Sequence, residues 1–393
     1  MPFVSLCLCG NRALDCEHEN DYNTIMRSGI AELPLHWGSA PRWLFARMTK
    51  LSRAISEIII GEYGTEEFLR RVSDPIWFQS LGCVLGFDWH SSGLTTTLCG
   101  ALKEGLRDLE KDFGLFIAGG KGKTSRKTPD EIRASAERLS FIPDNMVYAS
   151  RMSAKVDSCA LQDGYQIYHH TFFGTKDGKW AVVQQGMNIN THWARRYHWL
   201  SLDLKDFVVE PHKAIVSDKK GTALNMTAKE SEHARQTSTI IARNKPEISI
   251  KEFKQIKELR LPERHPVLTS DINPSRFEKI LLKTYENPPE NFAGLLATRG
   301  VGPQTIRALA LISEVAYGAK PSFSDPVSYT FAHGGKDGYP YPINRDHYDQ
   351  SIAILEKAIL NAKVGQNDKM QALKRLNNMS HFISNNIIKR DSE

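Results

Sequence analysis

Two closely spaced glycines, Gly300 and Gly302, stand between an apolar run and an amphipathic helix, and this pattern is typical of phosphate binding. The first glycine allows a left-handed backbone, and the second exposes backbone N–H groups at the positive end of the helix dipole. Such a helix start is a ready anion site. With the side chains of Thr305 and Arg307 close by, these residues are predicted to contact a nucleic-acid backbone. The simpler alternative is a plain turn that joins two helices.

The order of residues from Leu295 to Gly318, with Gly300-Val301-Gly302-Pro303 near its start, resembles the helix-hairpin-helix element of DNA repair and recombination proteins. In those proteins the hairpin contacts duplex phosphates without reading the bases, as backbone contacts generally do. The resemblance therefore implies a nucleic-acid partner, with duplex DNA as the expected form.

An acidic residue beyond the second helix extends this resemblance to base-excision glycosylases of the same class. Their second helix ends in an aromatic-glycine pair, as it does here at Tyr317-Gly318, and a catalytic aspartate follows. Asp325 matches that aspartate. Gln304 stands where bifunctional members carry a nucleophilic lysine, which disfavours a Schiff-base lyase mechanism. The alternative is that Asp325 only caps a turn before Pro326.

A second candidate phosphate-binding segment, GGKGKTSRKTPDE, is rich in glycine and cations. It is not a nucleotide-binding P-loop, because Ile117 stands five positions before Gly122, where that motif needs glycine. We expect a flexible cationic loop followed by a helix that begins near Thr128-Pro129. Its cations are predicted to bind a nucleic-acid or other polyanion backbone, although a merely solvated loop fits the same composition. The residues concerned are Lys121, Lys123, Arg126 and Lys127.

The segment from 155 to 198 has the densest group of side chains that could do chemistry. Aspartate, glutamine and lysine around a β-hairpin are the ingredients of metal-dependent phosphodiester cleavage. The candidate catalytic residues are Lys155, Asp157, Asp163, His169 and Gln185, in addition to Asp325. We expect a divalent ion, magnesium, manganese or zinc, to be held by Asp163 and a histidine, assigned as His169, with Gln185 from the paired strand. Lys155 is expected to offset the charge of the cleaved phosphate.

Two observations count against this metal-dependent chemistry. The D…(E/Q)-x-K order of such nucleases is absent from the sequence. The alternation of polar and apolar residues also fits a sheet with one half-exposed face.

Two further groups carry less weight. The cysteines at 7, 9 and 16 with His18 lack the spacing of a zinc knuckle and have no second ligand pair nearby. His90 adjoins Ser91, but neighbours in sequence do not have the geometry of a catalytic triad. Ser91 or Ser92 is therefore expected to cap a helix.

The elements that must position these residues follow from hydrophobic periodicity. Residues 41–62 carry apolar side chains at helical spacing, and further helices are expected from about 65, from 75 to 86 and from 91 to 112. The stretches GYQIYHHTFF and KWAVVQQGMN are rich in aromatic and β-branched residues. The Asp177-Gly178 pair between them predicts a hairpin turn, and RRYHWLSLDL is expected to add a strand.

The predicted fold class is α+β, mainly α: a helical N-terminal unit, a small antiparallel β module, and a helical C-terminal unit with the helix-hairpin-helix. The expected segments are 1–25, a disordered or spurious extension; 26–148, a helical domain with the basic glycine-rich loop; 149–212, the β-rich module; 213–285, a charged helical connector; 286–362, the helix-hairpin-helix unit; and 363–393, a polar tail.

The bulk composition excludes few functions. The chain has 393 residues, 41% hydrophobic and 24% charged, as in an ordinary soluble protein of two or three units. A net charge of +6 is compatible with an anionic partner but falls far short of a histone-like excess. No apolar run approaches the roughly 18 residues that cross a bilayer, so no membrane partner is expected. Six cysteines in this length favour a reducing cytoplasm.

Several segments, among them AELPLHWGSAPRWLFARM, KVDSCALQDGYQIYHH and GVGPQTIRALALISE, resemble a prokaryotic family of unknown function, the domain family numbered 763, over about residues 26–362. That family implies no activity. Three functions therefore compete: a DNA repair or processing enzyme, nuclease-like or glycosylase-like; a non-catalytic nucleic-acid-binding or scaffold protein; and an enzyme for a small phosphorylated substrate. The hairpin favours the first two, and the polar cluster favours the first over the second.

Overall fold

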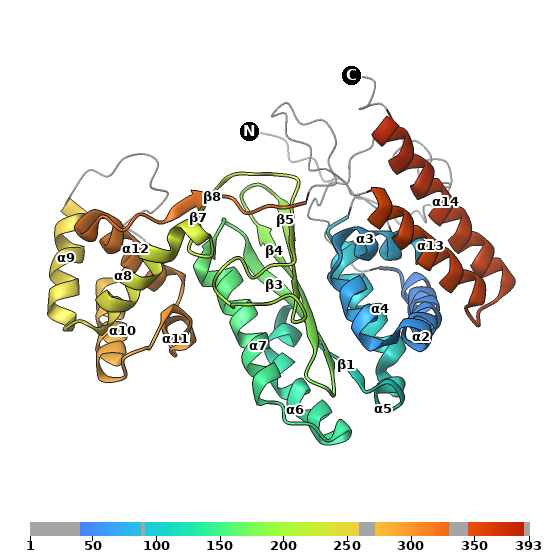
Figure 1. Cartoon of the computed structure of the whole chain (residues 1–393), viewed down its shortest axis with the longest axis horizontal. Coiled ribbons are helices and arrows are strands. Elements are labelled where there is room, and N and C mark those ends of the chain that lie inside the picture. Colours follow the sequence, from blue (N-terminus) through green and yellow to red (C-terminus); the bar gives the residue numbers. More distant parts are fainter. Residues whose placement is uncertain (1–39, 88–90, 259–271, 330–344, 389–393) are drawn as a thin grey trace, which may run out of the picture.

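The computed structural model describes residues 40–87, 91–258, 272–329 and 345–388. The predictions made for residues 1–25, including the cysteine group with His18, and for His90 concern residues outside these ranges. Within the described ranges the fold is α+β and mainly helical, as predicted (Figure 1). None of the described helices combines the length and the apolar character that a membrane crossing requires.

A five-stranded antiparallel sheet forms the centre of the molecule, with strand order β1-β3-β4-β5-β6. Its strands are β1 Leu115–Lys121, β3 Gln166–Thr175, β4 Trp180–Asn188, β5 Trp193–Leu200 and β6 Ala214–Val216. The predicted hairpin is confirmed, because β3 and β4 pair in antiparallel register on either side of the Asp177-Gly178 turn. Strand β1 was missed, because it was expected to belong to the helical N-terminal unit.

A second, three-stranded sheet joins segments that lie far apart in the sequence. Its strands are β2 Leu161–Gln162, β7 Thr222–Asn225 and β8 Ser322–Ser324, in the order β2-β7-β8. Strand β7 lies in the segment that was expected to be a helical connector. Strand β8 follows the helices of residues 274–317. Its pairing in this small sheet fixes the end of that helical unit beside the central sheet.

Helices cover both faces of the central sheet (Figure 1). One face packs against a bundle of helices from the two ends of the described chain. These are α2 Arg42–Ser73, α3 Pro75–Val84, α4 Gly93–Leu106, α5 Glu110–Phe113, α13 Arg345–Asn361 and α14 Gln366–Ile388. Within this bundle the short α5 leads directly into β1. The tail predicted to be polar therefore contains α14, whose Ala372, Leu376 and Met379 are buried in this core.

The other face packs against α6 and α7, and beyond these lies the C-terminal helical unit (Figure 1). The helices are α6 Thr128–Leu139, α7 Asp144–Lys155, α8 Glu232–Arg243, α9 Pro246–Glu258, α10 Pro274–Glu286, α11 Phe292–Ala297 and α12 Pro303–Tyr317. Because each face has its own core, successive side chains of a central strand enter different cores.

The glycine-rich segment begins as part of the sheet. Gly119 and Gly120 lie near the end of β1 with φ angles of +93° and +146°. A Cβ at Gly119 would lie 2.2 Å from the backbone oxygen of His170 on the paired strand. Glycine is therefore required at position 119 by the close approach of two strands.

Replacement of this glycine is expected to destabilise the fold. Gly119→Ala adds a backbone clash to an unfavourable φ, which alone costs about 1–3 kcal/mol, so we expect a loss of at least about 3 kcal/mol. The control is Gly122→Ala, where φ is +62° but no atom lies within 4 Å of an added Cβ. It should cost about 1–2 kcal/mol. Chemical denaturation measures both losses, and equal losses would contradict the steric explanation.

Candidate functional site

One buried arginine joins two of the predicted catalytic carboxylates. Arg195 Nη1 donates to Asp163 Oδ2 at 2.8 Å, and Nη2 donates to Asp325 Oδ2 at 2.8 Å, with all three side chains at most 2% exposed. Tyr197 donates its hydroxyl to Asp163 at 2.7 Å, and the backbone N–H of Gly221 donates to Asp325 at 2.8 Å. The structure therefore brings Asp163 and Asp325 together around a shared cation.

The electrostatics of this cluster are those of a buried ion pair. Burial alone would lower the pKa of the Arg195 guanidinium, but Asp163, Tyr197 and Asp325 raise it above its usual range. Burial raises the pKa of Asp163, against the opposing attraction of Arg195. The partners of Asp325 are those of a structural residue that links the end of β8 to β5.

Asp157 is completely buried on the same side of the sheet and meets three donors. Its Oδ2 accepts from Gln184 Nε2 at 2.5 Å and from Trp199 Nε1 at 3.0 Å, and its Oδ1 lies 2.5 Å from His212 Nε2. These contacts use most of the hydrogen bonds that the carboxylate can accept. Their effect is to fix the side-chain amide of Gln184, which in turn faces His170.

His169 and Gln185 point to the opposite face of the sheet from Asp163. They have the strand parity of Phe173 and Val183, which belong to the core under α2, α3 and α4, whereas Asp163 contacts the other face. The predicted metal ligands Asp163 and His169 are thus not brought together, because the irregularity in register between Ile167 and His169 turns His169 to the other face of the sheet. Within the described ranges, no group of three or more His, Cys, Asp or Glu side chains is placed to hold a metal ion.

The glycine hairpin connects α11 to α12. Gly300 has a φ of +103°, and Gly302 is the N-cap residue of α12. Lys155 donates from Nζ to the carbonyl oxygen of Val301. Lys155 was predicted to lie beside a cleaved phosphate. In the structure it stabilises the glycine hairpin through this hydrogen bond.

A second contact supports the hairpin from the same side. Gln162 Nε2 donates to the carbonyl oxygen of Pro303 at 2.9 Å, and Arg307 Nε donates to Gln162 Oε1 at 2.8 Å. Arg307 was predicted to contact phosphate, but this bond directs its guanidinium toward β2.

A small pocket of about 230 Å³ opens at the hairpin glycines, and two helices begin beside it. Helix α10 is capped by Asn273, whose side chain accepts from the backbone N–H of Arg276 at 3.0 Å, and α12 begins at Pro303. The residues that line the pocket are Ile272, Asn273, Arg276, Phe277, Gly300, Gly302, Pro303, Gln304 and Thr305. Of the predicted hairpin contacts, Gly300, Gly302 and Thr305 therefore share one site, and Arg276 is an unpredicted member.

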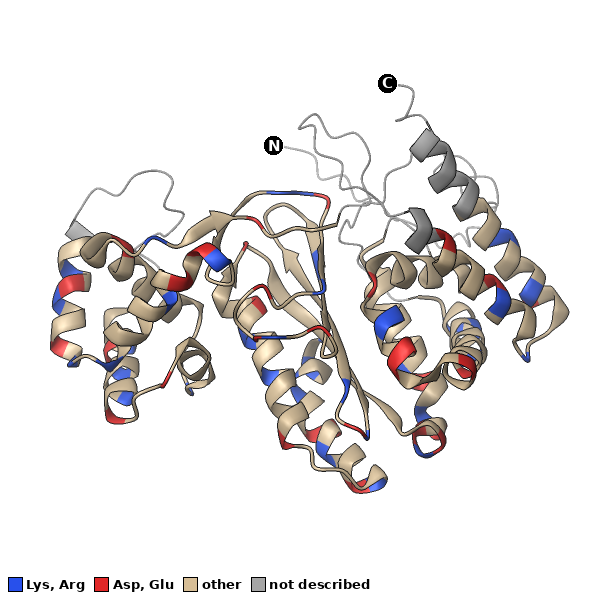
Figure 2. Cartoon of the chain, viewed as in Figure 1, with Lys and Arg blue, Asp and Glu red and all other residues tan. Residues whose placement is uncertain are grey.

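The cations of the glycine-rich segment have different surroundings. Lys121 Nζ lies 6.0 Å from the ring centroid of Tyr168, while Lys123 and Lys127 are exposed on the 3-10 turn Gly122–Lys127. Arg126 instead lines a larger cavity of about 620 Å³ beside α6, α7 and β3. Figure 2 shows Lys and Arg interspersed with Asp and Glu along the described helices.

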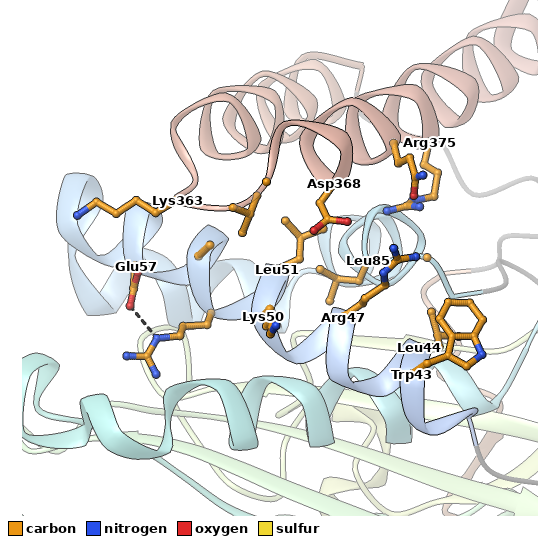
Figure 3. Close-up of a pocket in the computed structure, with 16 residues that line it drawn as sticks. Trp43, Leu44, Arg47, Lys50, Leu51, Glu57, Leu85, Lys363, Asp368 and Arg375 are labelled. Atoms are coloured by element: carbon orange, nitrogen blue, oxygen red, sulfur yellow. Dashed lines mark hydrogen bonds and ion pairs between the residues drawn. The ribbon is translucent and has the colours of Figure 1, made fainter.

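A third cavity, of about 600 Å³, lies between α2 and α14 (Figure 3). Trp43, Arg47, Asp368 and Arg375 lie at one end of it (Figure 3). Trp43 is 62% exposed, and Arg47 Cζ lies 5.8 Å from its ring centroid. The sequence could not indicate this cavity, because its walls come from opposite ends of the chain.

Removal of the central cation of the buried ion pair is expected to be costly. Arg195→Leu leaves the carboxylates of Asp163 and Asp325 buried without a countercharge, which should cost about 3–5 kcal/mol. The control is Arg107→Leu, which breaks an exposed pair with Glu104 and should cost about 0–1 kcal/mol. Urea denaturation at pH 7 measures both losses. A loss below 1 kcal/mol for Arg195→Leu would contradict the structural role of the pair.

Acid should destabilise the protein through its buried histidines. Burial lowers the pKa of His169 to about 3, from 6.5 for the exposed group. Below pH 6.5 His169 binds a proton in the unfolded chain but not in the folded protein. Its contribution to the free energy of unfolding is therefore complete above pH 6.5 and is lost as the pH falls toward 3. Between pH 6.5 and 5 the loss should be about 2 kcal/mol. Denaturation at both pH values should show a loss about 2 kcal/mol smaller for His169→Gln than for the wild type; identical losses would refute this assignment.

Comparison with known proteins gives one match. No curated protein and no solved structure matches the chain. The profile of one family, described as "Protein of unknown function (DUF763)", matches residues 29–343. This range contains the central sheet and the glycine hairpin between α11 and α12. It also contains Asp157, Asp163, Arg195 and Asp325 with the partners described above. The match covers most of the chain, and the chain therefore belongs to the DUF763 family.

Proposed function

We propose that the protein binds the phosphate backbone of nucleic acid at the pocket between the N-termini of α10 and α12. The observation that carries this proposal is the convergence of two helix starts on one pocket at the hairpin glycines. Each helix start presents backbone N–H groups and the positive end of a helix dipole. A phosphate in the pocket would meet both.

Two side chains support the backbone donors. Thr305 is 4% exposed and lines the pocket, and its hydroxyl has no hydrogen-bond partner among the described residues. The hydroxyl can donate a hydrogen bond to a phosphate oxygen in the pocket. Arg276 is exposed in the first turn of α10 and has no ion-pair partner in the described part of the chain. Its guanidinium is suited to a phosphate oxygen.

The hairpin is held in place before any ligand arrives. Its carbonyl groups accept from Lys155 and Gln162, which belong to α7 and β2. A site that is already ordered loses less conformational entropy when a ligand binds. More of the interaction free energy therefore contributes to the binding affinity.

A polymeric ligand is favoured over a single phosphate because a second cationic cavity adjoins the hairpin. Ala297, the last residue of α11, lines the cavity of about 620 Å³ together with Arg126 and Arg151. A chain of phosphates can contact the hairpin pocket and this cavity in succession. A nucleic-acid backbone has that form, and its binding is dominated by such contacts.

The proposal is tested by the salt dependence of binding to a mixed-sequence DNA duplex, measured by fluorescence anisotropy. Arg276→Ala should weaken binding and reduce the slope of log K against log salt by about 0.9, because one phosphate contact is lost. Thr305→Val should weaken binding without changing the slope, because it removes a neutral hydroxyl.

The matched control is Lys283→Ala, which removes the same charge from an exposed position further along α10. Its slope should equal that of the wild type. Equal slopes for Arg276→Ala and the wild type, or an absence of duplex binding by the wild type, would refute the proposal.

A further inference from the structure

The cavity of about 620 Å³ beside α7 has a serine and a histidine in contact on its wall. Ser150, from the second half of α7, and His170, from β3, both line it. Ser150 Oγ lies 2.9 Å from His170 Nε2. The two residues are only 3% and 4% exposed, so they are screened from bulk water while bordering a space that a ligand can enter.

The hydrogen bonds on the Nδ1 side of His170 determine which ring nitrogen carries the proton. Asp157 Oδ2 accepts from the indole N–H of Trp199 and from Gln184 Nε2. The Gln184 amide thus turns its Oε1 toward His170 Nδ1, 2.8 Å away, and an amide oxygen can only accept. Nδ1 therefore carries the proton, and Nε2 presents its lone pair to the hydroxyl of Ser150.

This order of groups is that of an activated nucleophile, a general base and a residue that orients the base. Burial lowers the pKa of His170, although Gln184 and Asp157 act in the opposite direction. The imidazole is therefore neutral at pH 7 and can accept the proton of Ser150.

The walls of the cavity favour an anionic ligand. Cations outnumber carboxylates among the charged residues that line it, which are Arg126, Arg133, Asp144, Arg151 and Lys155. Arg133 pairs with Asp130 at 3.1 Å and Lys155 contacts the hairpin, but Arg126 and Arg151 have no ion-pair partner within the described ranges. These two guanidinium groups are suited to phosphate oxygens.

We propose that Ser150 is the nucleophile of a hydrolase that cleaves a phosphate ester, with His170 as general base and Gln184 and Asp157 as positioning residues. The choice of a phosphate ester rests on the phosphate-backbone binding proposed above. Ser150 Oγ bonds to phosphorus while its proton moves to His170 Nε2. The bond from phosphorus to the leaving alcohol breaks, and the alcohol oxygen takes the proton from His170. Water then attacks phosphorus and gives a proton to His170, and the Oγ–P bond breaks, with that proton returning to Ser150.

A fluorophosphonate probe tests the nucleophile in the full-length protein. Attack by an activated serine forms an Oγ–P bond and releases fluoride. We expect one adduct, mapped by peptide mass spectrometry to Ser150 and absent from Ser150→Ala. Ser158→Ala, which removes an exposed hydroxyl eight residues further along, should label like the wild type. His170→Gln should slow labelling by about 10²–10⁴-fold.

Mapping the wild-type adduct makes the result independent of whether a variant folds. An absence of label on wild-type Ser150 would overturn the proposal, as would wild-type labelling rates in a His170→Gln variant with native circular dichroism. Labelling of wild-type Ser150 is measured without DNA and tests this proposal alone, whereas the salt dependence of duplex binding tests the hairpin proposal, so the two can fail separately.

The substrate class is tested with two chromogenic esters, bis(4-nitrophenyl) phosphate and 4-nitrophenyl acetate. Hydrolysis of the phosphodiester by the wild type, lost in Ser150→Ala, supports a phosphate-ester hydrolase. Hydrolysis of the acetate alone, or of neither ester, overturns that assignment.

Discussion

The burial of the central sheet on both faces is the constraint on which the rest of the structure depends. A polar side chain on such a sheet cannot bond to water, so it needs a partner inside the protein. On one face Arg195 neutralises Asp163 and Asp325. On the other face Arg196 donates to Gln79 Oε1 at 3.0 Å. Much of the density of polar residues that resembles a catalytic cluster in the sequence therefore serves to satisfy groups that the fold has buried.

The sequence predicted β3, β4 and β5 and the β-hairpin between β3 and β4 well, because these depend on local patterns. Aromatic and β-branched runs around Asp177-Gly178 leave few alternatives to a β-hairpin. The assignment of side chains to faces was harder. An irregularity in register lies between Ile167 and His169, so the simple alternation counted from the start of β3 does not continue through the histidines. A shift of one residue exchanges the face of every later side chain, and this separated the expected metal ligands.

The contacts that the sequence did not indicate are made by long-range packing. Arg195 and Asp325 are 130 positions apart, and Arg307 reaches Gln162 across 145 positions. Arg276 has no unusual neighbours in the sequence, and its importance arises only because α10 begins beside α12. Ser150 is likewise an ordinary helical serine until β3 places His170 against it. No local period encodes these encounters, because they depend on how separate elements pack.

Helix α7 physically links the two proposed sites. Ser150 meets the sheet at His170, and Lys155, five residues later, meets the hairpin at Val301. Residues two apart on a helix point in directions about 200° apart, so Lys155 faces the hairpin while Asp157, in the π-helical turn Val156–Ala160, faces the sheet. The end of α7 is thus held from both sides. The proposed phosphate site and the proposed nucleophile therefore share one structural element, because Lys155 and Ser150 belong to the same helix.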